Sequence, residues 1–219
     1  MNHLRRYLAS LACIAGVAQF AAIPVAAQAD SDKAVAGGGT IPAPWHAHTD
    51  GNAPLTNVKF TVMNPGQHVT LGPAAIFWRD ADTASGSYTV EAKFWQFAAP
   101  HHREGYGLIL GGRDLAGAGQ RYTYFIIAGT GEFLVKRRNG ESTSNVTSGW
   151  QANAAVVKQD TAGKAENTLT VRVSAGKVSF LVNGKEVYSG NSADLDVAGV
   201  FGYRVNHNLN VHLGPIAKR

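Results

Sequence analysis

Alternation of apolar and polar residues is the main pattern along this chain, and it predicts β-strands. It is clearest in Ser87–Phe97, where even-numbered positions 88–94 are apolar, odd-numbered positions 89–93 are polar, and Trp95 falls on the polar parity. Because successive side chains of a strand point to opposite faces, we expect the even set in the core and the odd set on the surface.

Further strands are expected at short intervals, separated by turn residues. Two connections contain Asn-Gly, at Asn139-Gly140 and Asn183-Gly184, which tight two-residue hairpins prefer because both turn positions need positive φ. The other strands are expected at Val58–Val62, Val69–Trp78, Tyr106–Gly111, Tyr122–Ile127, Phe133–Arg138, Val146–Gln151, Thr168–Val173, Val178–Val182, Lys185–Tyr188 and Val200–Leu213, the last with a bend.

This series of strands predicts an all-β fold. No segment of the mature chain has a sustained helical period with caps, so no long helix is expected. Frequent strands without intervening helices exclude a parallel α/β sheet and favour two antiparallel sheets packed as a sandwich. We expect this domain to span residues 56–219, after a flexible tether over residues 30–55 that contains Gly37-Gly38-Gly39 and three prolines.

The first 29 residues have the composition of a secretory signal peptide. Arg5-Arg6 forms a positive start, Leu8–Val25 is largely apolar, and Ala27-Gln28-Ala29 matches the small-x-small cleavage pattern. A retained membrane anchor is disfavoured because a proline precedes the cleavage pattern, and a lipoprotein is disfavoured because the residues before Cys13 fit a lipidation site poorly. We expect cleavage after Ala29 and export to the periplasm or the extracellular space.

The amino-acid composition excludes several kinds of site and argues against some kinds of partner. Cys13 is the only cysteine, so the mature chain has no disulfide and no thiolate ligand. The formal net charge is +5 for the whole chain, and no block of Lys and Arg occurs, which does not indicate nucleic-acid binding. No apolar run after residue 29 is long enough to span a bilayer. We expect a monomer without a cofactor, and a structural calcium ion is left open.

Several strands together resemble the concanavalin A-like lectin and glucanase jelly roll. The likeness covers about residues 57–219 and is carried by Tyr88–Phe94, Gly105–Leu110, Tyr122–Ile127, Gly131–Arg137, Asn167–Val173 and Phe180–Val187. The closest branch is similar to bacterial laminin-G-like and 3-keto-disaccharide hydrolase-like domains. The resemblance implies a curved sandwich with a glycan-binding groove on its concave sheet. An Arg that ends one strand of the hydrolase-like branch corresponds to Gly111 here, with Arg113 two residues later.

The leading hypothesis is a carbohydrate-binding protein. Trp95 lies on a polar parity, where the core needs no indole, and an exposed aromatic face suits stacking on a pyranose ring. Phe125 is expected beside it, since its neighbours Tyr122, Tyr124 and Ile126 occupy the opposite parity. Basic residues are expected to supply hydrogen-bond donors that would suit an anionic or oxidised sugar: Lys93, Arg113, Lys136 and Arg138.

Two alternatives stay open, so the sequence leaves enzymatic activity undecided. The first is a glycoside or keto-sugar hydrolase in which Glu91 works with His101 or His102 as a proton-transfer pair. A retaining glycosidase usually needs two nearby carboxyl groups, and the strand offers only one. The second is a non-catalytic protein-interaction domain. No metal site is expected, because His46-x-His48 has no evident third ligand nearby.

Overall fold

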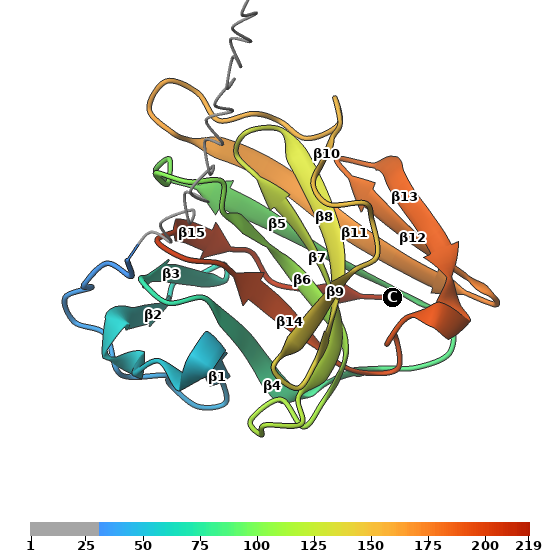
Figure 1. Cartoon of the computed structure of the whole chain (residues 1–219), viewed down its shortest axis with the longest axis horizontal. Helices are drawn as coiled ribbons and strands as arrows, with labels where there is room; N and C mark the ends of the chain where they lie inside the picture. The colour runs from blue at the N-terminus through green and yellow to red at the C-terminus, as the bar shows by residue number, and fades with distance from the viewer. Residues whose placement is uncertain (1–30) are drawn as a thin grey trace, which may run out of the picture.

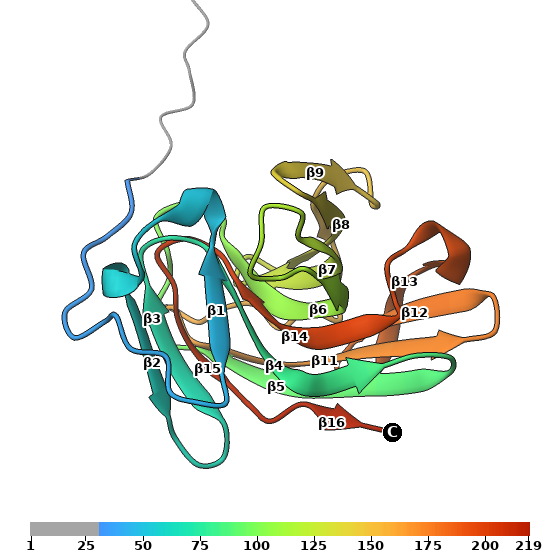
Figure 2. The same cartoon turned by 90° about the horizontal axis from the view of Figure 1, so that it is seen from below.

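The computed structural model describes residues 31–219, which form two antiparallel sheets packed face to face (Figures 1 and 2). The predicted signal peptide and its cleavage point at Ala29 lie outside the described residues. Three short 3-10 helices accompany the strands: η1 (Asp50–Asn52), η2 (Leu55–Asn57) and η3 (Ser192–Asp194). Within residues 31–219, no helix is long and apolar enough to cross a membrane. The expectation of an all-β sandwich without a long helix is confirmed.

The first sheet, sheet A, has eight strands in the order β1-β4-β14-β6-β7-β8-β10, with β9 paired to β8. In this order β6, β7 and β8 are consecutive in sequence, whereas β14 lies between β4 and β6, both of which are distant from it in sequence. The strands are β1 (His46–Thr49), β4 (Ala75–Ala84), β6 (Gly105–Arg113), β7 (Arg121–Ala128), β8 (Glu132–Asn139), β9 (Ser142–Asn145), β10 (Gln151–Ala152) and β14 (Gly199–Val205).

The second sheet, sheet B, has the order β13-β12-β11-β5-β15-β3-β2, with β16 paired to β5. The expected hairpin at Asn183-Gly184 is confirmed: it connects β12 to β13 with positive φ at both residues. A hairpin also joins β8 to β9, but there Asn139 ends the strand opposite Ser142 and the two turn residues are Gly140 and Glu141, so the expected Asn139-Gly140 turn is displaced by one residue. The strands are β2 (Val58–Val62), β3 (Gln67–Leu71), β5 (Tyr88–Gln96), β11 (Ala165–Ser174), β12 (Lys177–Val182), β13 (Lys185–Asn191), β15 (Asn210–Leu213) and β16 (Ala217–Lys218).

The main core lies between the two sheets. Phe94 on β5, Phe125 on β7 and Phe180 on β12 are fully buried there. On β5 the even-numbered side chains face this core, as the alternation predicted. Burial of each large apolar side chain contributes about 2–3 kcal/mol, so the inter-sheet layer holds the sandwich together.

Two predicted strands are each divided between the sheets. The expected strand Val69–Trp78 contains a turn, so that β3 belongs to sheet B and β4 to sheet A. The expected bend in Val200–Leu213 is confirmed, and it carries the chain from β14 in sheet A to β15 in sheet B. Alternation continues on both sides of each turn, and for that reason the sequence pattern does not reveal the change of sheet.

Part of the expected tether over residues 30–55 is built into the sandwich. Residues His46–Thr49 form β1 and pair with β4 at the edge of sheet A. Trp45 packs in the main core, 5.4 Å between ring centroids from Phe60. The sandwich therefore begins before residue 56, and the turn after β1 places Asp50 over the outer face of sheet A.

Candidate functional site

The outer face of sheet A carries a second apolar layer, separate from the core between the sheets. It consists of buried side chains from β4, β6, β7 and β8, together with Leu115: Ile76, Trp78, Ile109, Leu115, Tyr122, Tyr124, Ile126 and Leu134. Strands with apolar residues on both faces are ordinarily covered on both faces. Here the outer layer forms the floor of a hollow.

The hollow results from the curl of sheet A and from η1. Five inter-strand steps separate β1 from β8 in the sheet order, which is about 24 Å across a flat sheet. Asp50, directly after β1, nevertheless lies 3.4 Å from the Nη1 atom of Arg138 on β8. Figure 2 shows β1 rising on one side of sheet A and β8 with β9 rising on the other. The sheet therefore encloses the space between them.

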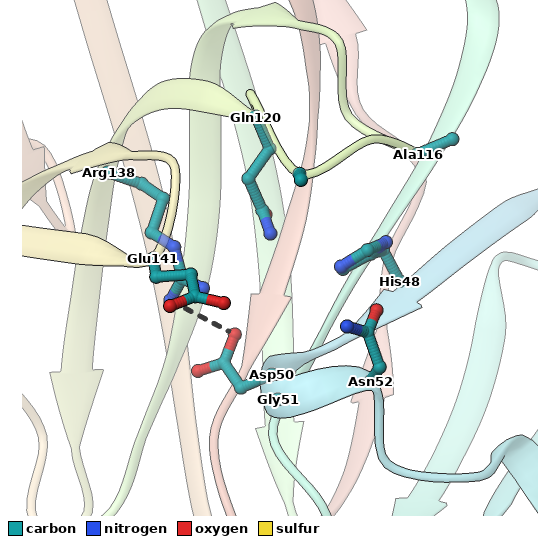
Figure 3. A pocket seen from close by; sticks show the side chains of 9 residues that line it. His48, Asp50, Gly51, Asn52, Ala116, Gln120, Arg138 and Glu141 are labelled. Carbon is teal, nitrogen blue, oxygen red and sulfur yellow. Dashed lines mark hydrogen bonds and ion pairs between the residues drawn. The ribbon is translucent and has the colours of Figure 1, made fainter.

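We call this hollow the sheet A groove and define it by two adjoining cavities of about 430 and 350 Å³ that share Asp50, Arg138 and Glu141. Both volumes lie within the range of small-molecule sites. The first cavity is also lined by His48, Asn52 and Gln120, whose side chains face the hollow in Figure 3.

A buried ion cluster lies at the centre of the sheet A groove. Arg204 on β14 donates from Nη1 and Nη2 to the two carboxylate oxygens of Asp50 at 2.8 and 2.5 Å, and from Nε to Asn206 at 2.9 Å. Arg138 contacts the same carboxylate from β8 and donates from Nε to the Gly140 carbonyl at 2.5 Å. Both arginine side chains are less than one-tenth exposed. One carboxylate thus faces two buried cations.

The electrostatics of the groove reflect this composition. Burial opposes ionisation of Asp50, but its hydrogen bond to Arg204 and the charges of Arg204 and Arg138 hold its pKa below the ordinary value. Burial, and then the charges of Arg204 and Arg138, lower the pKa of the Lys136 ammonium. The groove is therefore a region of positive potential in which Asp50 stays ionised.

Aromatic rings lie beside these charges. Tyr124 pairs directly with Lys136 across β7 and β8, and its ring centroid lies 5.7 Å from the guanidinium carbon of Arg204. Burial raises the pKa of Tyr124 to about 12, so its hydroxyl remains a hydrogen-bond donor. Trp150 packs on Gly105, where an added Cβ would lie 2.7 Å from the indole. Its partly exposed ring also lines the groove, with Arg103 at 5.4 Å.

The predicted ligand-binding residues divide between the two outer faces. Lys136 and Arg138 line the sheet A groove. Trp95 and Lys93 lie on β5 in the opposite sheet and face outward, where both contact Glu166 and the Trp95 indole donates to it at 2.7 Å. The expectation of one groove containing all of these residues is wrong, because the sandwich separates them. Trp95 does occupy the surface parity that its sequence position predicted.

Two further placements differ from expectation. Phe125 is fully buried between the sheets and packs 5.3 Å from Phe180 between ring centroids. The interpretation of Phe125 as a stacking platform is therefore wrong. The reason is that β7 is apolar on both faces: Tyr122 and Tyr124 belong to the outer layer of sheet A, and Tyr124 lines the groove. Arg113 is exposed at the end of β6, beyond a register irregularity, and donates to the Ala198 carbonyl at 3.4 Å.

The proposed proton-transfer residues do not share a site. Glu91 lies on the outer face of sheet B, accepting from the Thr170 hydroxyl at 2.8 Å and from Arg219 at 3.4 Å. His101 and His102 are exposed on the β5–β6 loop and line a different cavity, of about 250 Å³, with Thr130 and Gln159. The structure thus gives no geometric support to a pair formed by Glu91 and either histidine.

Sequence analysis did not identify several residues of the groove, among them Asp50, Tyr124, Trp150 and Arg204. Asp50 lies within residues 30–55, which the sequence predicted to be a flexible tether and not part of the folded domain. A signal existed for Arg204, because a charged residue between Tyr203 and Val205 in an apolar strand requires a buried partner. Within residues 31–219, no group of three or more His, Cys, Asp or Glu is placed to hold a metal ion.

Comparisons with known proteins show what this architecture is similar to. No family model matches the sequence, and no curated protein matches it. Among solved structures, the carbohydrate binding module CBM66 from Bacillus subtilis is similar with a TM-score of 0.60 and 10% identity, over 80% of this chain and 94% of that one. The fold is a jelly roll.

Two other solved structures share the fold. The exoplasmic/lumenal domain of VIP36, in a Ca²⁺/Man-bound form, has a TM-score of 0.53 and 10% identity over 80% of this chain and 82% of that one. A Bacillus subtilis protein of unknown function with a galectin-like fold has a TM-score of 0.56 and 11% identity over 80% and 89%. At such low identity these likenesses establish architecture alone.

Proposed function

We propose that this protein is exported and binds carbohydrate in the sheet A groove without transforming it. One observation carries the proposal: a hollow of ligand size joins aromatic rings, Tyr124 and Trp150, to hydrogen-bonding groups on the buried Arg138 and Arg204 and on the partly buried Asp50. Sugars offer apolar ring faces and hydroxyl edges, and sites that recognise them combine aromatic surfaces with fixed polar groups. Two of the similar structures are a carbohydrate binding module and a mannose-bound domain, which supports the proposal.

A hydrolase is less well supported by the geometry. Glycoside hydrolysis ordinarily requires one carboxyl group able to donate a proton beside a second carboxylate. Both oxygens of Asp50 accept hydrogen bonds from Arg204, and this pairing keeps the group ionised. Glu91, His101 and His102 lie outside the groove. Membership of a laminin-G-like or 3-keto-disaccharide hydrolase-like branch stays a prediction from the sequence.

Replacement of Trp150 by alanine is expected to weaken glycan binding about tenfold or more, because a partly exposed indole in a hollow supplies apolar contact to a sugar ring. Binding is measured by calorimetric titration with ligands found on a glycan array. Circular dichroism and thermal unfolding establish that the variant folds.

Trp95→Ala is the matched control, since Trp95 is a partly exposed tryptophan on the other sheet. We expect less than a twofold change in affinity for this variant. If Trp95→Ala abolished binding and folded Trp150→Ala retained it, the ligand would lie on sheet B and the proposed site would be wrong. Absence of any glycan ligand would refute the function itself.

A further inference from the structure

We infer that the sheet A groove recognises an anionic sugar, one that carries a carboxylate or sulfate group, with Lys136 and Arg138 as the charged contacts. The inference rests on the proposed function, because it names the ligand class of that site. Four cationic side chains line one cavity: Lys136, Arg138, Arg204 and Arg103, of which Arg103 pairs with Glu132. Two carboxylates line the same cavity, Asp50 and the exposed Glu141. The centre of the groove therefore has an excess of positive charge.

The hydrogen bonds show which cations are left for a ligand. Arg204 is the main hydrogen-bond partner of Asp50, because it donates to both carboxylate oxygens. Arg138 uses Nε on the Gly140 carbonyl and reaches Asp50 only at 3.4 Å from Nη1, so its Nη2 has no hydrogen-bond partner among residues 31–219. Within residues 31–219 the Lys136 ammonium makes no hydrogen bond or ion pair, and Asp50 is the one carboxylate whose charge raises its pKa. An incoming anion would meet two partly unpaired donors.

The positions of these donors suit one acidic group attached to a sugar ring. Lys136 and Arg138 lie two residues apart on the same face of β8, about 7 Å along the strand, within the reach of two long side chains toward one anion. Tyr124 lies directly opposite Lys136 in the sheet register. A pyranose ring placed over the aromatic floor would bring its acidic substituent next to the ammonium group.

Lys136 has already lost part of its hydration in the folded protein, before any ligand binds. Lys136 is half-buried beside two guanidinium groups, and both burial and these like charges disfavour its ammonium form. An anionic ligand would relieve that repulsion and form charge-assisted hydrogen bonds, which are stronger than neutral ones. A neutral sugar would leave the repulsion in place. Selectivity for the anion follows from this difference.

The test compares sugars that differ only in charge. Oligomers of glucuronate, galacturonate and mannuronate are titrated against their carboxyl-reduced neutral counterparts, and a sulfated oligosaccharide against its desulfated form. At least one charged ligand should bind about tenfold or more tightly than its neutral partner, and its affinity should fall as salt is raised. Binding of the uronate oligomers would identify a carboxylate ligand, and binding of the sulfated oligosaccharide would identify a sulfate ligand.

Lys136→Gln tests the role of the ammonium group. This variant should weaken binding of the charged ligand about tenfold while changing binding of the neutral counterpart less than twofold. Lys93→Gln, an exposed lysine of sheet B paired with Glu166, is the matched control and should have no effect. Loss of binding to charged and neutral ligands alike would give Lys136 a structural role and overturn its assignment.

The possible failures are distinguishable. If neutral sugars bind as tightly as their charged counterparts, or if only neutral sugars bind, the groove still binds carbohydrate and the inference about charge is overturned. If no sugar of either class binds, the proposed function fails together with the inference. Binding of charged sugars that is unchanged in Lys136→Gln would place the anion elsewhere on the molecule.

Discussion

Asp50→Asn should lower the free energy of unfolding by about 3 kcal/mol, because removing one partner of a buried ion cluster leaves the other charges uncompensated. Arg204 is the residue most affected, since its side chain is only 7% exposed and both of its Nη atoms donate to Asp50. Arg138 loses the same counter-charge. Chemical denaturation followed by tryptophan fluorescence measures the change.

The control for Asp50→Asn is Asp80→Asn. Asp80 pairs with His46 on the surface, where the two side chains are 77% and 50% exposed, and exposed pairs contribute about 0–1 kcal/mol. The double variant Asp50→Leu with Arg204→Met should recover part of the loss, since it removes the buried charge along with its partner. A loss below about 1 kcal/mol for Asp50→Asn would show that water solvates the cluster, contrary to the buried geometry.

The stability of the protein should also decrease in acid through the same residue. The pKa of Asp50 is lower in the folded protein than its ordinary value near 3.8, so protonation favours the unfolded chain. The stabilisation is complete above about pH 5 and is lost as the pH falls through 4 toward the folded-state pKa. Denaturation between pH 7 and pH 3 should show a smaller acid-dependent loss in Asp50→Asn than in the native protein.

Phe125→Ala should destabilise the protein by about 3–5 kcal/mol, the cost of a cavity left by a large buried aromatic side chain. The ring is fully buried between the sheets, with Phe133 and Phe180 at centroid distances of 6.4 and 5.3 Å. The same denaturation experiment measures the loss. Affinity per folded molecule should change little, since Phe125 faces away from the sheet A groove.

Phe97→Ala is the matched control for Phe125→Ala. Phe97 is 42% exposed after β5, and surface substitutions of this kind ordinarily change stability by less than about 1 kcal/mol. A large effect at Phe97 with a small one at Phe125 would contradict the placement of the two rings. It would restore the interpretation of Phe125 as a surface residue.

Local patterns in the sequence determined the architecture. Two-residue alternation located most of the strands and oriented β5 correctly, because one of its faces is apolar and the other polar. Asn-Gly located the β12–β13 hairpin through its need for positive φ. These features depend on residues that are close in sequence, and they were sufficient to predict a two-sheet sandwich.

Tertiary structure decided where the groove lies and what lines it. In β7 both faces are apolar, so alternation in the sequence cannot tell which face points to the core. Only the packed sheets show that Phe125 faces inward and Tyr124 outward. Asp50 and Arg204 are 154 residues apart in sequence, and their pairing depends on the curl of sheet A and on the fold of η1. The residues of such a site come from strands that are far apart in sequence, so no short sequence motif indicates it. Their geometry is set only when the folded sheets bring these strands together.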